Sequence, residues 1–124
     1  MIIGIGTDLL KKDGISDAVL QAGDPFREKT FTRKESEQAQ KRPIPGDDLR
    51  CRFAAKEAVF KSLGEDPESA RLNEIEILDD ERGAPHVTLH GALKQHAVMK
   101  KIHAVHVSIS YDGDYAQAFA ISEG

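Results

Sequence analysis

Large and small side chains alternate most regularly near the C-terminal end of the chain. Residues 105–111 alternate between apolar or aromatic and polar side chains, and residues 115–121 alternate between larger side chains and alanines. The two runs flank Asp112-Gly113, which suits a two-residue type I′ turn, so the pattern predicts a β-hairpin. The alanine face of the second strand is small enough to let a helix approach closely.

Three further apolar runs are short enough to be strands. Residues 2–5 are apolar and lead into Gly6-Thr7-Asp8, which predicts a buried strand followed by a turn. Isoleucines alternate with glutamates over residues 74–77, and apolar residues alternate with polar ones over residues 87–90. Residues 79–85 between them are polar and contain glycine and proline, so a second hairpin is expected there.

A longer spacing of apolar residues predicts the helices. Thr32 followed by Glu35 has the spacing of a capping box, which should begin a polar helix of about ten residues. Residues 16–22 are weakly helical, and residues 92–100 form a plausible short helix.

The clearest helix should begin at Asp47 or Asp48 as its cap and end at Leu63, where Gly64 stops it. Apolar and small residues cover nearly all of its surface, which is typical of a buried helix. The chain is therefore predicted to be a single compact α+β domain over residues 1–124, with an antiparallel sheet packed against a long central helix.

Composition narrows the functional classes. The chain has 124 residues, which suits one domain. Cys51 is its only cysteine, which excludes an internal disulfide and favours a cytoplasmic protein. No segment approaches the ~20 apolar residues of a membrane span, and the N-terminal run lacks a basic flank, so we expect neither a membrane partner nor a secretory signal.

Charge is distributed unevenly along the chain. The net charge is −4, which argues against a nucleic-acid partner. Residues 1–63 nevertheless carry +2 and residues 64–124 carry −6. An acidic partner should therefore meet the N-terminal half.

Two carboxylates stand out as candidates for chemistry. Glu57 and Lys61 are four residues apart on the long helix, where a surface ion pair is the ordinary interpretation. This helix has little free polar face, so a carboxylate there needs a cation, a metal or hydrogen-bond donors. Asp8 follows an apolar strand and two glycines; with Glu57 it would make an all-oxygen site of the kind that Mg²⁺ takes. His106 is a third candidate, on the polar face of its strand.

These candidates lie in short motifs that recur in a known family. The motifs are Gly4-Ile5-Gly6-Thr7-Asp8, Arg52-Phe53-Ala54-Ala55-Lys56-Glu57-Ala58-Val59-Phe60-Lys61, Gly83-Ala84-Pro85 and His106-Val107-Ser108-Ile109-Ser110. Their order and spacing resemble those of the 4′-phosphopantetheinyl transferases. The length is similar to that of the short bacterial type, the holo-acyl-carrier-protein synthases.

The resemblance implies an activity and its partners. Such enzymes transfer 4′-phosphopantetheine from coenzyme A to a serine of apo acyl carrier protein and release adenosine 3′,5′-bisphosphate. They depend on Mg²⁺, with Mn²⁺ as an alternative. The short type assembles as homotrimers with coenzyme A bound between subunits.

The resemblance also assigns roles to residues. Asp8 and Glu57 correspond to the metal ligands, and Glu57 and Lys61 to the catalytic pair. Either Glu57 or a metal-bound water would accept the serine proton. The expected contacts to the nucleotide come from Arg52, Lys56, Lys61, Gly83, Pro85 and His106. Arg52 and Lys56 could share one phosphate, or they could be exposed helix charges.

One stretch departs from the family. After the first aspartate, relatives often place an acidic residue and then an arginine that helps to hold the carrier protein. Residues 9–14 here are Leu9-Leu10-Lys11-Lys12-Asp13-Gly14, so this contact should be altered or moved. A replacement basic surface could come from Lys11, Lys12, Arg27 and Arg33. The departure leaves open a catalytically weak relative that binds coenzyme A or carrier protein without efficient transfer. An unrelated small α+β binding domain is the remaining alternative.

Overall fold

The computed structural model describes residues 1–124, and its largest sheet has three antiparallel strands in the order β1-β5-β4. These are β1 (Ile2–Lys11), β4 (Ala104–Asp112) and β5 (Tyr115–Glu123). The predicted C-terminal hairpin is confirmed, but its turn is not the predicted one. Asp112 pairs with Tyr115, so the loop residues are Gly113 and Asp114. Only Gly113 has a positive φ, of 55°, which is the pattern of a type II′ turn.

The first strand is longer than its apolar run. The predicted turn at Gly6-Thr7-Asp8 is wrong, because β1 continues to Lys11 and pairs with β5 as far as Tyr115. The two glycines are therefore strand residues. Glycine within a strand often marks a place where another backbone approaches closely, and a helix occupies that place here.

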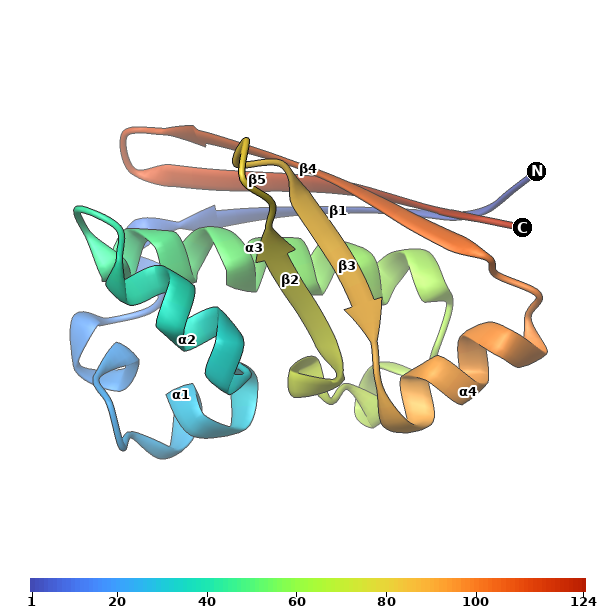
Figure 1. Ribbon diagram of the computed structural model, residues 1–124, viewed down its shortest axis with the longest axis horizontal. Coiled ribbons are helices and arrows are strands. Elements are labelled where there is room, and N and C mark those ends of the chain that lie inside the picture. The colour runs from blue at the N-terminus through green and yellow to red at the C-terminus, as the bar shows by residue number, and fades with distance from the viewer.

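The long helix α3 (Pro45–Leu63) lies against the inner face of this sheet (Figure 1). It is buried nearly all round, as predicted, and Gly64 ends it with φ of 67°. Its start differs from the prediction. Ile44 is the cap and Pro45 is the first helical residue, where the missing N–H of proline costs nothing. Asp47 and Asp48 lie in the first turn instead of capping it.

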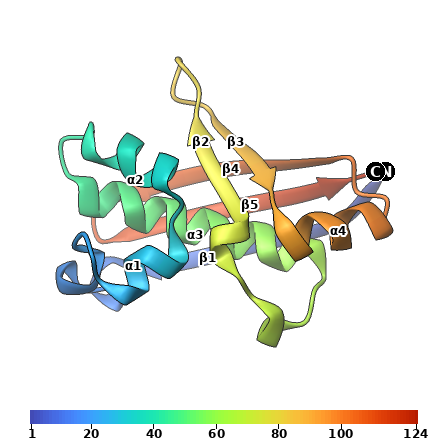
Figure 2. The same ribbon diagram turned by 60° about the horizontal axis from the view of Figure 1, so that its bottom comes forward.

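A second, two-stranded antiparallel sheet crosses α3 on the side away from β1, as Figures 1 and 2 show. It is the predicted hairpin of β2 (Ile75–Asp79) and β3 (Pro85–Leu89). The helix α4 (Gly91–Met99) follows it and agrees with the expected position. Figure 2 places α1 and α2 at one end of α3 and α4 at the other.

The segment before α3 is mostly helical. The capping box of Thr32 and Glu35 is present at the start of α2 (Arg33–Gln40). The weak helix predicted over residues 16–22 is only a short 3₁₀ turn, Asp17–Leu20. The helix α1 (Pro25–Thr30), capped by Asp24, was not predicted because proline and a charged stretch hide its periodicity.

Two apolar clusters hold these elements together. The larger has 14 buried residues and joins α3 to both sheets and α4. The smaller consists of Ile15, Leu20, Phe31, Ala39 and Leu49, and packs α1 and α2 against the start of α3. None of the helices combines the length and the apolar character needed to span a bilayer.

Candidate active site

The glycines of β1 bring its backbone against α3. A Cβ at Gly4 would lie 2.0 Å from the carbonyl oxygen of Ser62, and a Cβ at Gly6 would lie 2.0 Å from that of Ala58. Because side chains alternate along a strand, Gly4, Gly6 and Asp8 share one face. The close approach therefore places the Asp8 carboxylate beside the helical turn that carries Glu57 and Lys61.

Lys61 connects the helix to the strand. Its Nζ lies 3.6 Å from Oδ1 of Asp8 and donates a hydrogen bond of 2.9 Å to the carbonyl oxygen of Thr7. It makes no ion pair with Glu57, so the ordinary i, i+4 interpretation of that pair is not what the structure contains. Its side chain remains 54% exposed and is accessible from outside.

Both carboxylates are held where negative charge is unfavourable. Burial raises the pKa of Glu57, the nearby charge of Asp8 raises it further, and Lys61 opposes this. Burial also raises the pKa of Asp8, again against the effect of Lys61. One lysine therefore compensates two half-buried carboxylates, so a second positive charge would stabilise the pair.

This donor set fits a magnesium ion that shares its ligands with a phosphate-bearing substrate. Mg²⁺ in proteins usually takes one or two carboxylates, and waters and substrate phosphates complete its octahedron. No group of three or more His, Cys, Asp or Glu side chains could hold a metal within the chain. Asp8 and Glu57 would therefore bind Mg²⁺ only if water or substrate oxygens completed its coordination.

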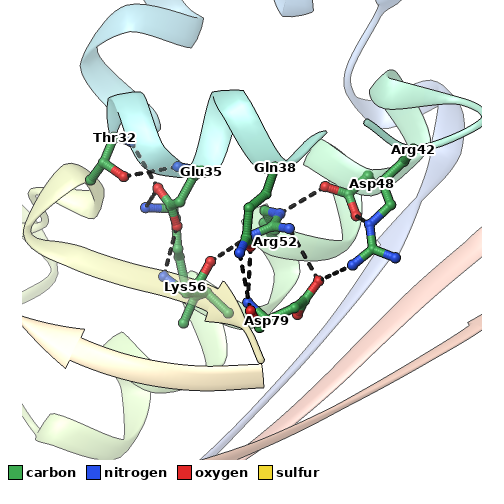
Figure 3. Close-up of polar contacts among 9 residues, drawn as sticks. Thr32, Glu35, Gln38, Arg42, Asp48, Arg52, Lys56 and Asp79 are labelled. Carbon is green, nitrogen blue, oxygen red and sulfur yellow. Dashed lines mark hydrogen bonds and ion pairs between the residues drawn. The ribbon is translucent and has the colours of Figure 1, made fainter. Parts of the chain in front are cut away.

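Arg52 and Lys56 were predicted to contact a nucleotide phosphate or to be exposed, and they are neither at an open site nor exposed. Both are buried, with exposed fractions of 2% and 0%. Arg52 pairs with Asp48 at 2.7 Å and with Asp79 at 3.2 Å, and Lys56 pairs with Glu35 at 2.7 Å (Figure 3). Their predicted contact with a nucleotide phosphate is therefore corrected, because their polar atoms already face protein acceptors on the other side of α3.

The other predicted nucleotide contacts lie apart from the carboxylate pair. Gly83 lies in the β2–β3 turn with φ of 84°, and Pro85 is the first residue of β3. His106 is exposed on β4, with Nε2 3.0 Å from a carboxylate oxygen of Glu123. No hydrogen bond or ion pair joins these residues to Asp8, Glu57 or Lys61 in the same chain.

The basic residues proposed for carrier binding fall into two groups. Lys11 is exposed, Lys12 is half-buried with Nζ 3.2 Å from Oδ1 of Asp47, and both border a hollow of about 500 Å³ at the end of β1. Arg33 is exposed beside Glu37. Arg27 is buried and donates to the carbonyl oxygen of Leu20 at 2.9 Å, so it offers no charge to a partner and its prediction is corrected.

Some residues around α3 escaped the sequence analysis. Glu35 is fully buried, although the capping box predicted only its contact with the start of α2. No sequence motif pointed to Gln38 or Asp79. The Gln38 side chain is hydrogen-bonded to the main chain of Asp79 at the edge of β2. Their contacts join elements that lie about 40 residues apart in the sequence, which no local pattern reports.

Comparisons with known proteins identify the family. The family model of the 4′-phosphopantetheinyl transferase superfamily matches residues 4–120, which include all three site residues. The chain belongs to this superfamily. A relative from Clostridium tetani, a holo-[acyl-carrier-protein] synthase, is 37% identical, and the match covers 100% of this chain and 98% of that protein.

Solved structures support the same family fold. The holo-[acyl-carrier-protein] synthase of Neisseria meningitidis has a TM-score of 0.87 and 31% identity, and the match covers all of both chains. An ACPS–CoA complex from Chronobacterium ammoniagenes has a TM-score of 0.79 and 31% identity, with 96% of this chain and 95% of that one covered. The α+β fold with a central helix is therefore confirmed for this transferase.

Proposed function

We propose that this chain transfers 4′-phosphopantetheine from coenzyme A to a serine hydroxyl of an apo acyl carrier protein and releases adenosine 3′,5′-bisphosphate. The observation that supports it most directly is the convergence of Asp8, Glu57 and Lys61 at the β1–α3 contact. Two carboxylates short of positive charge and one accessible lysine suit a reaction on a pyrophosphate.

The bond changes can be assigned to groups of the chain. The serine oxygen forms a bond to the β-phosphorus of coenzyme A, and the bond from that phosphorus to the bridging oxygen breaks. The electron pair leaves with the bridging oxygen on adenosine 3′,5′-bisphosphate. Lys61 is placed to neutralise or protonate this leaving phosphate, and Glu57 or a water beside it takes the serine proton.

Asp8 and Glu57 would hold Mg²⁺, or Mn²⁺ in its place. When bound, the ion would neutralise charge on the pyrophosphate oxygens. The chain itself contributes the fixed separation of the two carboxylates, because β1 and α3 are in backbone contact there. Holding the carboxylates in place before the substrate arrives reduces the reorganisation needed in the transition state.

The rest of the nucleotide site is proposed to lie between subunits of a homotrimer. Gly83, Pro85 and His106 remain our candidates for nucleotide contacts, and none of them touches the carboxylate pair within one chain. The outer face of the three-stranded sheet exposes Ile5, Leu9 and Phe119 by 61%, 66% and 46%. Contiguous apolar surface of this kind is typical of an interface.

We propose that the carrier docks at the end of β1, where Lys11 is exposed and Lys12 is half-buried. Arg33 could extend this basic surface along α2. An acidic partner would be attracted there, because the N-terminal half of the chain carries the positive balance. The reaction is placed in the cytoplasm, in keeping with the single cysteine.

Intact-mass spectrometry of an apo acyl carrier protein tests the proposal. The carrier is incubated with the chain, coenzyme A and Mg²⁺, with a parallel reaction in EDTA. We expect a gain of one phosphopantetheine that EDTA abolishes, together with adenosine 3′,5′-bisphosphate in the supernatant. No gain with several carriers, while coenzyme A still binds, would instead support the weak relative that binds without transfer.

A further inference from the structure

One edge of β2 has no neighbouring strand. β2 pairs with β3 on one side only, through an antiparallel register in which Ile77 lies opposite Val87. Alternate residues of a strand direct their main-chain groups to opposite edges, so those of Ile75, Ile77 and Asp79 lie on the open side. Open edges of this kind ordinarily need covering.

Side chains of α3 satisfy the carbonyl groups of this edge. Lys56 donates through Nζ to the carbonyl oxygen of Ile75 at 2.5 Å and to that of Leu72 at 2.8 Å. Arg52, one helical turn earlier, donates to the carbonyl oxygen of Ile77 at 2.5 Å. The helix is therefore fastened to the open edge of β2 at two successive positions.

Side chains of α2 satisfy the amide groups of the same edge. The Glu35 carboxylate accepts from the N–H of Ile77 at 2.8 Å. Gln38 accepts from the N–H of Asp79 at 2.9 Å and donates to the carbonyl oxygen of Asp79 at 3.0 Å. Gln38 thus makes the pair of bonds that a neighbouring strand residue would make, as Figure 3 shows.

The Lys56–Glu35 ion pair is the centre of this arrangement. Both side chains are fully buried, and their charged atoms are 2.7 Å apart. The same Glu35 oxygen also accepts from the N–H of Thr32 at 2.8 Å. A buried ion pair is tolerated when its remaining donors and acceptors are satisfied, and no buried side-chain nitrogen or oxygen of this chain lacks a partner.

Lys56 precedes Glu57 in the sequence, and the two side chains leave α3 about 100° apart. One points to the edge of β2 and the other to β1. Rotation or sliding of α3 would therefore move both together. We infer that Lys56 is a positioning residue, which holds Glu57 against Asp8 by fastening α3 to the edge of β2. The inference rests on the proposed role of Glu57 as a metal ligand.

The test compares Lys56→Met with the double variant Glu35→Gln/Lys56→Met. Methionine keeps the length of the side chain, while the single variant leaves Glu35 charged and unpaired in the interior. The double variant removes both charges, and its glutamine keeps one acceptor for the N–H of Ile77. It loses the acceptor for the N–H of Thr32 and the donor to the carbonyls of Ile75 and Leu72, so it should recover part of the lost stability. Lys29→Met, at an exposed lysine of α1, is the matched control.

Three readouts separate positioning from stability. Thermal unfolding reports stability, Mn²⁺ binding is measured by electron paramagnetic resonance with coenzyme A present and no carrier, and steady-state kinetics separate kcat from KM. For both variants at Lys56 we expect about tenfold or greater losses in kcat and in Mn²⁺ affinity. The KM for coenzyme A should change by less than about threefold, because these side chains are buried against protein partners. The control should match the wild type throughout.

Recovery of Mn²⁺ affinity and kcat together with stability in the double variant would overturn the inference, since Lys56 would then only stabilise the fold. The same holds if the single variant folds and binds Mn²⁺ normally. Absence of Mn²⁺ binding in the wild type would contradict the proposed metal role of Glu57 itself, which is a different result from a loss confined to the Lys56 variants.

Discussion

At the scale of single residues, the site is defined by an unfavourable arrangement of charge. Asp8 and Glu57 are brought together by a backbone contact, and burial raises the pKa of both above their ordinary values of 3.8 and 4.5. The native chain without metal therefore binds protons more tightly than the unfolded chain does. By linkage, these two groups lower the free energy of unfolding of the metal-free protein as the pH rises from their ordinary pKa values through the raised pKa values of the native state.

Glu57→Gln should remove the destabilisation that the ionised Glu57 carboxylate causes in the metal-free protein. In EDTA we expect the variant to melt about 1 to 3 °C higher than the wild type near pH 7, with the difference shrinking as the pH falls toward 4. Phosphopantetheine transfer should be lost, because one metal-binding charge is gone. Differential scanning calorimetry across pH, with the exposed Glu68→Gln as control, measures it. An equal or lower melting temperature for the variant at pH 7 would contradict the electrostatic account.

Gly6→Ala tests the backbone contact that places Asp8. The new Cβ would lie 2.0 Å from the carbonyl oxygen of Ala58 and 2.9 Å from the Cβ of Lys61, so β1 and α3 must separate. We expect a loss of about 1 to 3 kcal/mol in the free energy of unfolding, measured with urea, and a lower kcat. In Gly14→Ala the new Cβ meets its nearest neighbour at an ordinary 3.4 Å, so this control should keep both properties.

At the scale of elements, helix ends decide how the chain turns from one layer to the next. After α4 the N–H of Lys101 bonds to the carbonyl of Val98, and the N–H of Ile102 bonds to that of Ala97. This is a Schellman motif, in which the residue after the cap takes a left-handed conformation. Lys101 has φ of 60° there and is the one residue other than glycine with a positive φ.

Lys101→Gly should therefore stabilise the protein. Glycine adopts positive φ without the steric cost that a side chain carries, so we expect a gain of about 0.5 to 1 kcal/mol in the free energy of unfolding. Transfer activity should be unchanged. The neighbouring Lys100→Gly serves as the opposite control: its φ of −83° suits any residue, and it gives up a contact with Gly64. Urea denaturation of both variants gives the comparison.

At the scale of the whole molecule, the outer face of the β1-β5-β4 sheet exposes several large apolar side chains. Exposed apolar side chains there alternate with the buried glycines and alanines that face α3. The alternation of side chains along these strands therefore gives the sheet a small-residue inner face and an apolar outer face. The inner one makes the core, and the outer one is our candidate for the contact between subunits.

Leu9→Lys/Phe119→Lys should dissociate the proposed trimer without unfolding the chain. Both side chains are solvent-exposed in the isolated chain, so their replacement removes apolar surface only from the interface. Light scattering after size-exclusion chromatography should change from a trimer to a monomer, and the KM for coenzyme A should rise. Ile44→Lys, at an equally exposed position away from the sheet, should remain trimeric. A monomeric mass for the wild type by light scattering would contradict the proposed trimer.

Lys11→Glu/Lys12→Glu tests the carrier surface at the same scale. Reversing two positive charges should raise the KM for the acidic carrier about tenfold or more at low salt, and less at high salt because ions screen the attraction. Coenzyme A binding, measured by calorimetry, should be unaffected. Lys29→Glu carries one such reversal at another exposed site and should have little effect. An unchanged carrier KM would place docking elsewhere.

Most of the elements, and the candidate residues of the site, could be predicted from the amino-acid sequence. Periodicity located both hairpins and the long helix, since side chains repeat every two or 3.6 residues according to the backbone. The capping box of α2 and the end of α3 at Gly64 could be recognised in the sequence because capping is a local interaction. Asp8, Glu57 and Lys61 followed from motifs in which few residue types suit the chemistry.

Which charged side chains lie at the candidate site and which are buried in ion pairs of the fold became clear only from the folded structure. Arg52 and Lys56 were predicted to contact a nucleotide phosphate or to be exposed helix charges, because a local pattern cannot show that β2 would leave an open edge beside them. Lys61 was paired with Glu57 in sequence, yet it lies against Asp8 because two glycines let β1 touch α3. Both outcomes depend on main-chain groups far away in the sequence. Apart from the missing N–H of proline, such groups are the same in every residue and become specific partners only after the chain has folded.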